Sequence, residues 1–99
     1  MSFDRIIREE ARLVILRALE EQPDGRLNSE LLRLTLESYG ITKSRDWVHD
    51  ELSWLREMGA VTVLVAGTVR VAAITAKGAD HVGRRTIVEG IKRPSRPEA

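Results

Sequence analysis

The residue types that most often carry chemistry are few in this chain, and their spacing suits no known site. There are no cysteines and two histidines, His49 and His81, which lie far apart in the sequence. His49 stands close to Asp46 and Asp50, a grouping that could hold a metal ion or work as an acid–base pair. No second histidine is near enough to complete a ligand set, and no Gly-x-Ser-x-Gly turn presents a serine nucleophile. We therefore expect no catalytic residue, no metal site and no cofactor, and we expect both histidines on the surface.

One stretch approaches the sequence of a phosphate-binding loop. Residues 78–86 read GADHVGRRT, to be compared with the pattern G-x-x-x-x-G-K-[ST]. Arg84 replaces the lysine of that pattern, Arg85 replaces its hydroxyl residue, and the stretch is predicted to be helix rather than loop. The sequence therefore predicts no nucleotide site, no small-molecule substrate and a protein that is not an enzyme.

The charges are nearly balanced but unevenly distributed. The chain has 16 Lys and Arg residues against 15 Asp and Glu residues. Residues 76–99 alone contain six Lys or Arg and three Asp or Glu. A basic end on a near-neutral body favours a polyanionic partner, and the alternative is a tail that only increases solubility.

The elements that must position these cations follow from the spacing of apolar residues. Helical spacing recurs over residues 4–22, 29–39 and 44–59, with breaks at 23–25 and at Gly40. Asp4, Asn28 and Ser44 are expected to cap these helices. The second and third helices, joined by a short turn, have the layout of a helix-turn-helix.

The apolar period then changes from that of a helix to that of a strand. Residues 61–66 and 69–74 predict a β-hairpin with a tight turn at Gly67, and Thr75 is expected to cap a short helix over 76–83. This order is that of the winged helix-turn-helix: an α+β, mostly helical fold with three helices, a β-hairpin wing and a short C-terminal helix. At 99 residues the chain holds one domain, which we assign to 1–83. Residues 84–99 are predicted to be a flexible basic tail, because they contain prolines, many charges and few apolar residues.

One segment of the sequence, and the chain as a whole, resemble known proteins. Residues 73–78, AITAKG, are similar to the junction between wing and helix in many bacterial winged-helix regulators. The whole chain resembles small winged-helix proteins encoded by Mu-like phages and prophages. The matching features are its opening helix, its Leu-rich second helix, its Trp-bearing third helix and the ending Gly90-Ile91-Lys92-Arg93-Pro94-Ser95. This resemblance implies a phage or prophage origin and a winged-helix fold, and it implies no catalytic or binding residue.

The third helix is the one that a helix-turn-helix protein places in the major groove of DNA. Its apolar arc contains both tryptophans, Trp47 and Trp54, which are expected in the core, with the alternative that one anchors a partner at the edge. Glu51 falls inside the same arc, where it either has a basic or hydrogen-bonding partner or lies at the edge of the arc. The exposed side has a cationic edge and an acidic edge. The residues predicted to contact DNA on this helix and the turn before it are Lys43, Arg45, His49, Ser53 and Arg56.

The wing and the tail supply the remaining predicted DNA contacts. Arg70 is the only cation on the two wing strands, and the turn at Ala66-Gly67 has none. The basic tail is therefore expected to supply most phosphate contacts, through Arg84, Arg85, Lys92, Arg93 and Arg96.

The first helix contains four consecutive apolar residues, Leu13-Val14-Ile15-Leu16. They cannot all face one small core. We therefore predict a homodimer with Leu13, Ile15 and Leu16 at its interface, Ile15 being the most exposed.

These observations leave two functions open. The first is a phage or prophage transcriptional regulator that binds double-stranded DNA as a homodimer in the cytoplasm of a bacterial host. The second is a protein-interaction adaptor in phage assembly with no DNA function, favoured by the acidic residues of the third helix and the uncharged wing tip. No apolar run approaches the ~20 residues that a membrane span needs.

Overall fold

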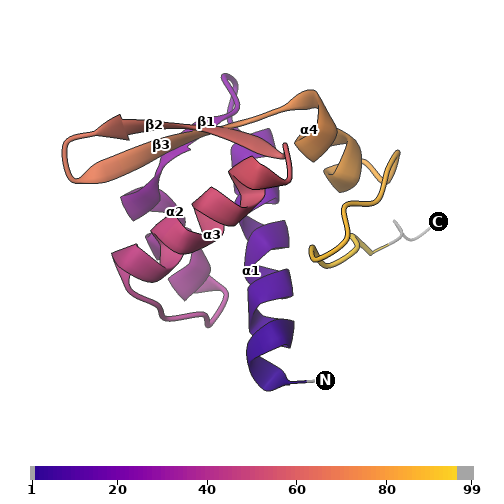
Figure 1. The fold of residues 1–99 in the computed structure, drawn as a ribbon, viewed down its shortest axis with the longest axis horizontal. Coiled ribbons are helices and arrows are strands. Elements are labelled where there is room, and N and C mark those ends of the chain that lie inside the picture. Colours follow the sequence, from indigo (N-terminus) through magenta and orange to yellow (C-terminus); the bar gives the residue numbers. More distant parts are fainter. Residues whose placement is uncertain (1, 96–99) are drawn as a thin grey trace.

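The computed structural model describes residues 2–95, which form four helices and one three-stranded antiparallel sheet (Figure 1). The elements are α1 (Phe3–Glu20), β1 (Arg26–Asn28), α2 (Ser29–Ser38), α3 (Arg45–Glu57), β2 (Val61–Ala66), β3 (Val69–Ile74) and α4 (Ala76–Val82). The predicted helix-turn-helix and wing are therefore confirmed. No helix among residues 2–95 combines the length and the apolar character that crossing a membrane requires.

The helices begin where side-chain oxygens satisfy their first backbone N–H groups. Asn28, Ser44 and Thr75 cap α2, α3 and α4 as predicted, each by accepting a hydrogen bond from the residue three positions on. The cap of α1 is Ser2 rather than Asp4, because the Ser2 hydroxyl accepts from Arg5 N while Asp4 lies in the first turn.

The sheet has the strand order β1-β3-β2, so the wing is extended by a strand that the sequence did not predict. β2 and β3 pair from Val61↔Ile74 to Ala66↔Val69, and Gly67 takes the left-handed φ of 61° that the tight turn requires. β1 pairs with β3 from Arg26↔Ala73 to Asn28↔Val71. A run of three residues is too short to show the alternation of apolar and polar residues that predicts a strand. β1 forms because the free edge of β3 can hydrogen-bond to it.

Helix α1 lies at the centre of the core. The prediction that Leu13, Ile15 and Leu16 on this helix form a dimer interface is therefore wrong. The helix packs against α2, α3, α4, β1 and β3, so neighbours surround it on several sides. Leu13 and Leu16 are buried, and Ile15, predicted to be the most exposed, has 0% exposed surface. The apolar run is broad because several elements cover it. Leu13, Ile15 and Leu16 therefore form no surface for a second copy.

The segment of residues 84–95, called the C-terminal segment below, is packed on the domain, contrary to the predicted flexible tail (Figure 1). Val88 and Ile91 are 2% and 4% exposed and belong to the core. His81, predicted on the surface, is buried and holds the segment: Val88 N–H donates to its Nδ1 at 3.1 Å, and its Nε2 lies 3.0 Å from Lys92 O. The domain therefore extends to residue 95, and the predicted boundary at residue 83 is wrong. Arg96 lies outside the described residues.

Candidate nucleic-acid interface

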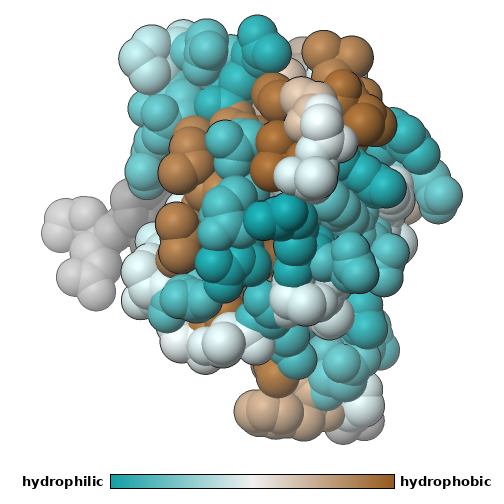
Figure 2. Space-filling view, turned by 90° about the vertical axis from the view of Figure 1, so that its left-hand side faces the viewer, coloured by the Kyte–Doolittle hydropathy of each residue, from teal (hydrophilic) through white to brown (hydrophobic). Residues whose placement is uncertain are grey.

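The N-terminal half of α3 and the wing together form the candidate interface. Ser44 caps α3, and the turns that follow point Arg45, Asp46 and His49 towards the wing tip. An open groove of about 420 Å³ separates helix and wing, and it is lined by Arg45, Asp46, His49, Val65, Gly67, Thr68, Val69 and Arg70. Figure 2 looks onto the end of the molecule that carries the wing tip, where a hydrophilic strip is flanked by brown hydrophobic groups.

A hydrogen-bonded network fixes the wing to α3. Arg70 on β3 donates its backbone N–H to Ser29 Oγ at 3.0 Å and its guanidinium to Ser53 Oγ on α3 at 3.3 Å. The buried Ser29 hydroxyl also lies 2.7 Å from His49 Nε2. Three predicted residues, His49, Ser53 and Arg70, are thus brought together. Ser29, which links them from α2, was missed because its only signal in the sequence is a position at the start of a helix.

The surroundings of His49 favour its neutral form. Partial burial lowers the pKa of His49, and the positive charges of Arg70 and Arg45 act in the same direction. The carboxylates of Asp46 and Asp50 oppose this effect without cancelling it. At neutral pH the imidazole is therefore an uncharged hydrogen-bonding group in the groove.

The other cations near the start of α3 are partly engaged. Arg45 Nη2 lies 3.5 Å from Glu30 Oε1, and Arg33 contacts the same carboxylate at 2.7 Å. The hydrogen bond from Arg33 lowers the pKa of Glu30, so Glu30 stays ionised there. Lys43 Nζ lies 5.3 Å from the centroid of the Trp47 ring, a cation–π arrangement that holds the ammonium beside the helix.

The acid that fell within the apolar arc of α3 is buried and fully paired. Glu51 is 1% exposed, with Oε2 at 2.7 Å from Arg8 Nη1 and Oε1 at 2.6 Å from Arg12 Nε. The Arg12 guanidinium lies 3.8 Å from the centroid of the half-buried Trp54 ring. Of the four acids on α3, one is thus neutralised inside the domain. The exposed side of α3 therefore has two cations, Arg45 and Arg56, and three acids, Asp46, Asp50 and Glu57.

The predicted tail cations do not join this surface. The C-terminal segment lies beside α4 and α1, at the end of the molecule away from the wing tip (Figure 1). Arg85 pairs with Asp80 at 2.8 Å, and Lys92 pairs with Glu10 at 2.7 Å. The single positive face of helix, wing and tail that tail-mediated DNA binding requires is therefore interrupted.

Comparisons with known proteins identify the relatives of the chain. No protein-family model matches it. It is 39% identical over 94 residues to the uncharacterized protein gp26 of Escherichia phage Mu, across 95% of this chain and 96% of that protein. The chain belongs to the family of this phage protein. An uncharacterized protein of Haemophilus influenzae strain Rd is 41% identical over 63 residues, which cover 64% of this chain and 61% of that protein.

Solved structures of RosR from H. salinarum share the fold. One has a TM-score of 0.65 at 22% identity, over 76% of this chain and 67% of that chain. A structure described as the complex hsRosR-S1 has a TM-score of 0.63 at 22% identity, over 75% of this chain and 65% of that chain. RosR is a winged-helix protein, and these likenesses confirm the predicted fold class. The relation to a Mu phage protein is confirmed as well.

Proposed function

We propose that this phage-family protein is a regulator that binds double-stranded DNA, with the N-terminal half of α3 in the major groove and the wing beside it. The observation that carries this proposal is the double anchoring of Arg70 to Ser29 and Ser53. It fixes the wing relative to α3, so the groove between them is preformed. Preformed surfaces lose little entropy on binding.

The side chains divide into those that read bases and those that hold phosphates. Arg45, His49 and Ser53 face the major groove, where arginine pairs with guanine and hydroxyls bond to several bases. Lys43, Arg56 and Arg70 hold the phosphate backbone. The burial of Glu51 supports this assignment, because it removes one of the acids that would repel phosphate. The cations Arg84, Arg85, Lys92 and Arg93 have a smaller part, since two of them are already paired.

We infer that two copies act together on DNA, as in other helix-turn-helix proteins that read two half-sites. Because the middle of α1 is buried, the surface that suits a second copy is the exposed apolar start of that helix, Phe3 and Ile6. The double substitution Phe3→Glu and Ile6→Glu is expected to give a folded monomer. Sedimentation of the wild-type chain as a monomer at tens of micromolar would count against the dimer.

Fluorescence anisotropy on a labelled random-sequence duplex at several salt concentrations tests DNA binding. The double variant Arg56→Gln and Arg70→Gln removes two cations assigned to the phosphates, so the slope of log K against log salt should fall in magnitude by up to about 1.8. Arg5→Gln, an exposed arginine near the start of α1, is the matched control and should leave the slope unchanged. No binding by the wild-type chain even at about 50 mM salt would contradict the proposal.

One observation favours the second candidate, a protein-interaction adaptor in phage assembly. The wing carries exposed apolar residues, with Leu64 at 65% and Val65 at 76% exposed, and its tip has no cation. Absence of DNA binding, together with loss of a protein partner in Val65→Asp, would favour this function.

A further inference from the structure

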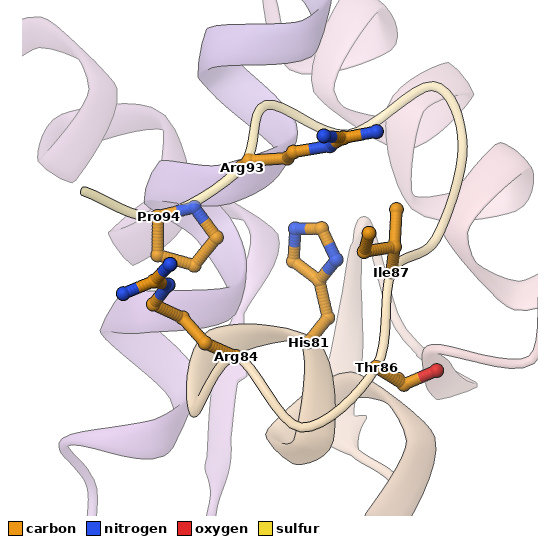
Figure 3. Close-up of a pocket in the computed structure, with 6 residues that line it drawn as sticks. All are labelled: His81, Arg84, Thr86, Ile87, Arg93 and Pro94. Carbon is orange, nitrogen blue, oxygen red and sulfur yellow. The ribbon is translucent and has the colours of Figure 1, made fainter. Parts of the chain in front are cut away.

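The pocket between α4 and the C-terminal segment holds no converging set of polar groups (Figure 3). Its two arginines, Arg84 and Arg93, lie on opposite sides of the His81 ring and point away from one another. Both nitrogens of that ring are already engaged in holding the C-terminal segment. The backbone groups that remain open to a partner lie instead on the wing.

The outer strand of the wing has a row of backbone groups that face away from the sheet. β2 is the last strand of the order β1-β3-β2 (Figure 1). Its pairing with β3 ends at Ala66↔Val69, beside a two-residue turn, where the flanking residues exchange both backbone hydrogen bonds. Bonded and non-bonded pairs alternate along an antiparallel ladder. Val63 and Val65, called the open-edge valines below, therefore direct their N–H and C=O groups away from β3.

Two hydrogen bonds of β3 support this orientation. Arg70, which lies opposite Val65, donates its N–H to Ser29 Oγ at 3.0 Å. Further along the strand, Ile74 donates its N–H to Gly25 O at 3.0 Å. Both bonds lead to the side of β1 and α2, away from β2. Among residues 2–95, no hydrogen bond satisfies the backbone of the open-edge valines, so this edge can accept another strand.

The residues of β2 suit pairing with an identical strand. Natural edge strands are usually protected by charges, proline or a bulge. β2 reads Val-Thr-Val-Leu-Val-Ala, without charge or proline, and its register with β3 has no bulge. Leu64 is 65% exposed and Val65 is 76% exposed. When two copies pair about a two-fold axis, identical residues meet at that axis, so a charge there would face its own copy. This strand has none.

We propose that this edge pairs antiparallel with the same edge of a second copy, with the two-fold axis at Leu64. Val63 of each copy then exchanges two backbone hydrogen bonds with Val65 of the other. The two Leu64 side chains form the non-hydrogen-bonded pair at the axis, where side chains lie closest. An axis at Val63 would instead require Val61, which is only 2% exposed. The Leu64 register therefore uses the accessible backbone groups.

This contact is small and is separate from the apolar start of α1. That helix begins at the end of the molecule away from the sheet, so the wing contact adds to the α1 contact (Figure 1). One strand from each copy covers far less than the about 1,200 Å² of a stable interface, so free copies pair only near millimolar concentration. Copies bound side by side on one duplex have effective concentrations of that order. This use of the contact rests on the proposed DNA binding, whereas the pairing itself does not.

NMR of the full chain without DNA tests the pairing. The chain with Phe3→Glu and Ile6→Glu, which removes the α1 contact, is followed from about 20 μM to about 1 mM. The amides of the open-edge valines should shift with concentration. Their hydrogen exchange should slow about twofold when half of the chains are paired. The amides of Thr62 and Leu64, which bond to β3 in the single copy, should change less.

Charges placed at the axis distinguish pairing from a change in folding. In Leu64→Lys or Leu64→Glu alone, like charges meet at the axis, and the concentration dependence should be lost. An equimolar mixture of the two variants should restore it, because a lysine then faces a glutamate. Leu31→Lys and Leu31→Glu are the matched controls, since Leu31 is also an exposed leucine but lies on α2. Neither should change the pairing.

Three results would overturn the proposal: open-edge amides that do not change up to about 1 mM, an equal loss in the Leu31 variants, or no recovery in the mixture. The first result would leave an extended segment of another protein as the occupant of this edge. Because these samples contain no DNA, a failure of DNA binding in the anisotropy experiment leaves this test unaffected.

Discussion

Arg70 at the wing end and Arg85 at the C-terminal end of this molecule are held by different kinds of partner. At the wing end, Arg70 is oriented by the neutral hydroxyl of Ser53 and keeps its full charge. At the other end, Arg85 is held by the carboxylate of Asp80, and Arg12 by the buried Glu51. A hydroxyl partner fixes a guanidinium without neutralising it, whereas a carboxylate partner makes the arginine part of the structure. The partner of Arg70 therefore leaves its charge available for binding, whereas the partners of Arg85 and Arg12 use those charges within the fold.

The largest expected effect is a loss of stability when Arg8 and Arg12 lose the carboxylate that they share. Glu51→Ala leaves Arg8 and Arg12 without their shared carboxylate beside the core, and the free energy of unfolding should fall by about 3–5 kcal/mol. Glu57→Ala removes an exposed acid from the same helix and should change stability by less than about 0.5 kcal/mol. Urea denaturation monitored by tryptophan fluorescence measures both. Similar stabilities of the two variants would show that the Glu51 pair contributes little.

A smaller loss of stability is expected from Gly90, where the C-terminal segment meets α3. Its φ is 94°, and a Cβ there would lie 2.5 Å from the Trp54 ring, which Arg12 covers on its face. Gly90→Ala should therefore lower the free energy of unfolding by about 2–3 kcal/mol. Gly40→Ala is the matched control: Gly40 also has a positive φ, 81°, but a Cβ would contact nothing. Its cost should be only about 1 kcal/mol, and equal losses would mean that the Trp54 contact is unimportant.

Local sequence signals predicted the elements near the wing better than the packing of the C-terminal end. Helical spacing, the caps at Asn28 and Ser44 and the apolar alternation of the hairpin are local, and each was confirmed. The C-terminal segment is held by the nearby His81 and by the distant helix α1, through Arg12 and Glu10, and no periodicity reveals these contacts.

On helix α3, the sequence showed a charged residue among apolar ones, Glu51, but not what surrounds it in the fold. The position of Glu51 in the apolar arc left two possibilities, a partner or a place at the edge of the arc. Arg8 and Arg12, four residues apart on α1, were the available signal, but pairing them with Glu51 required knowing how α1 and α3 pack. The cations of the groove remain predicted DNA contacts, and their partners within the fold depended on tertiary contacts that the sequence does not show.

Ser53→Ala tests whether the hydroxyl partner of Arg70 matters for DNA binding, and a moderate loss of DNA affinity is expected. It removes the hydroxyl that orients Arg70 but leaves the positive charge in place. DNA affinity should fall about 2- to 10-fold, as expected for one hydrogen bond of 0.5–1.5 kcal/mol, with an unchanged salt slope. Arg70→Gln should lower both the affinity and the slope. Anisotropy at several salt concentrations distinguishes them, and a reduced slope in Ser53→Ala would show that the hydroxyl does more than orient the arginine.

The smallest expected effect is the pH dependence contributed by His49. Burial and the charge of Arg70 lower its pKa in the folded state, so the unfolded chain binds more protons between that lowered pKa and about 6.5. The stability contribution of His49 is therefore complete above about pH 6.5 and decreases as the pH falls through that window. In His49→Gln this decrease should be absent, so the difference between the two denaturation curves isolates it from other titrating groups.

DNA affinity should change with pH in the opposite direction. An imidazolium in the groove adds a cation near phosphate, so wild-type binding should tighten as the pH falls from 7 to 5.5, while His49→Gln binds with little change over the same range. Ser29 Oγ can accept a hydrogen bond from a protonated Nε2–H, so the network tolerates the charged form. Parallel anisotropy and denaturation series at fixed ionic strength compare the two trends. If affinity and stability decrease together in the wild-type chain, His49 serves only to support the wing.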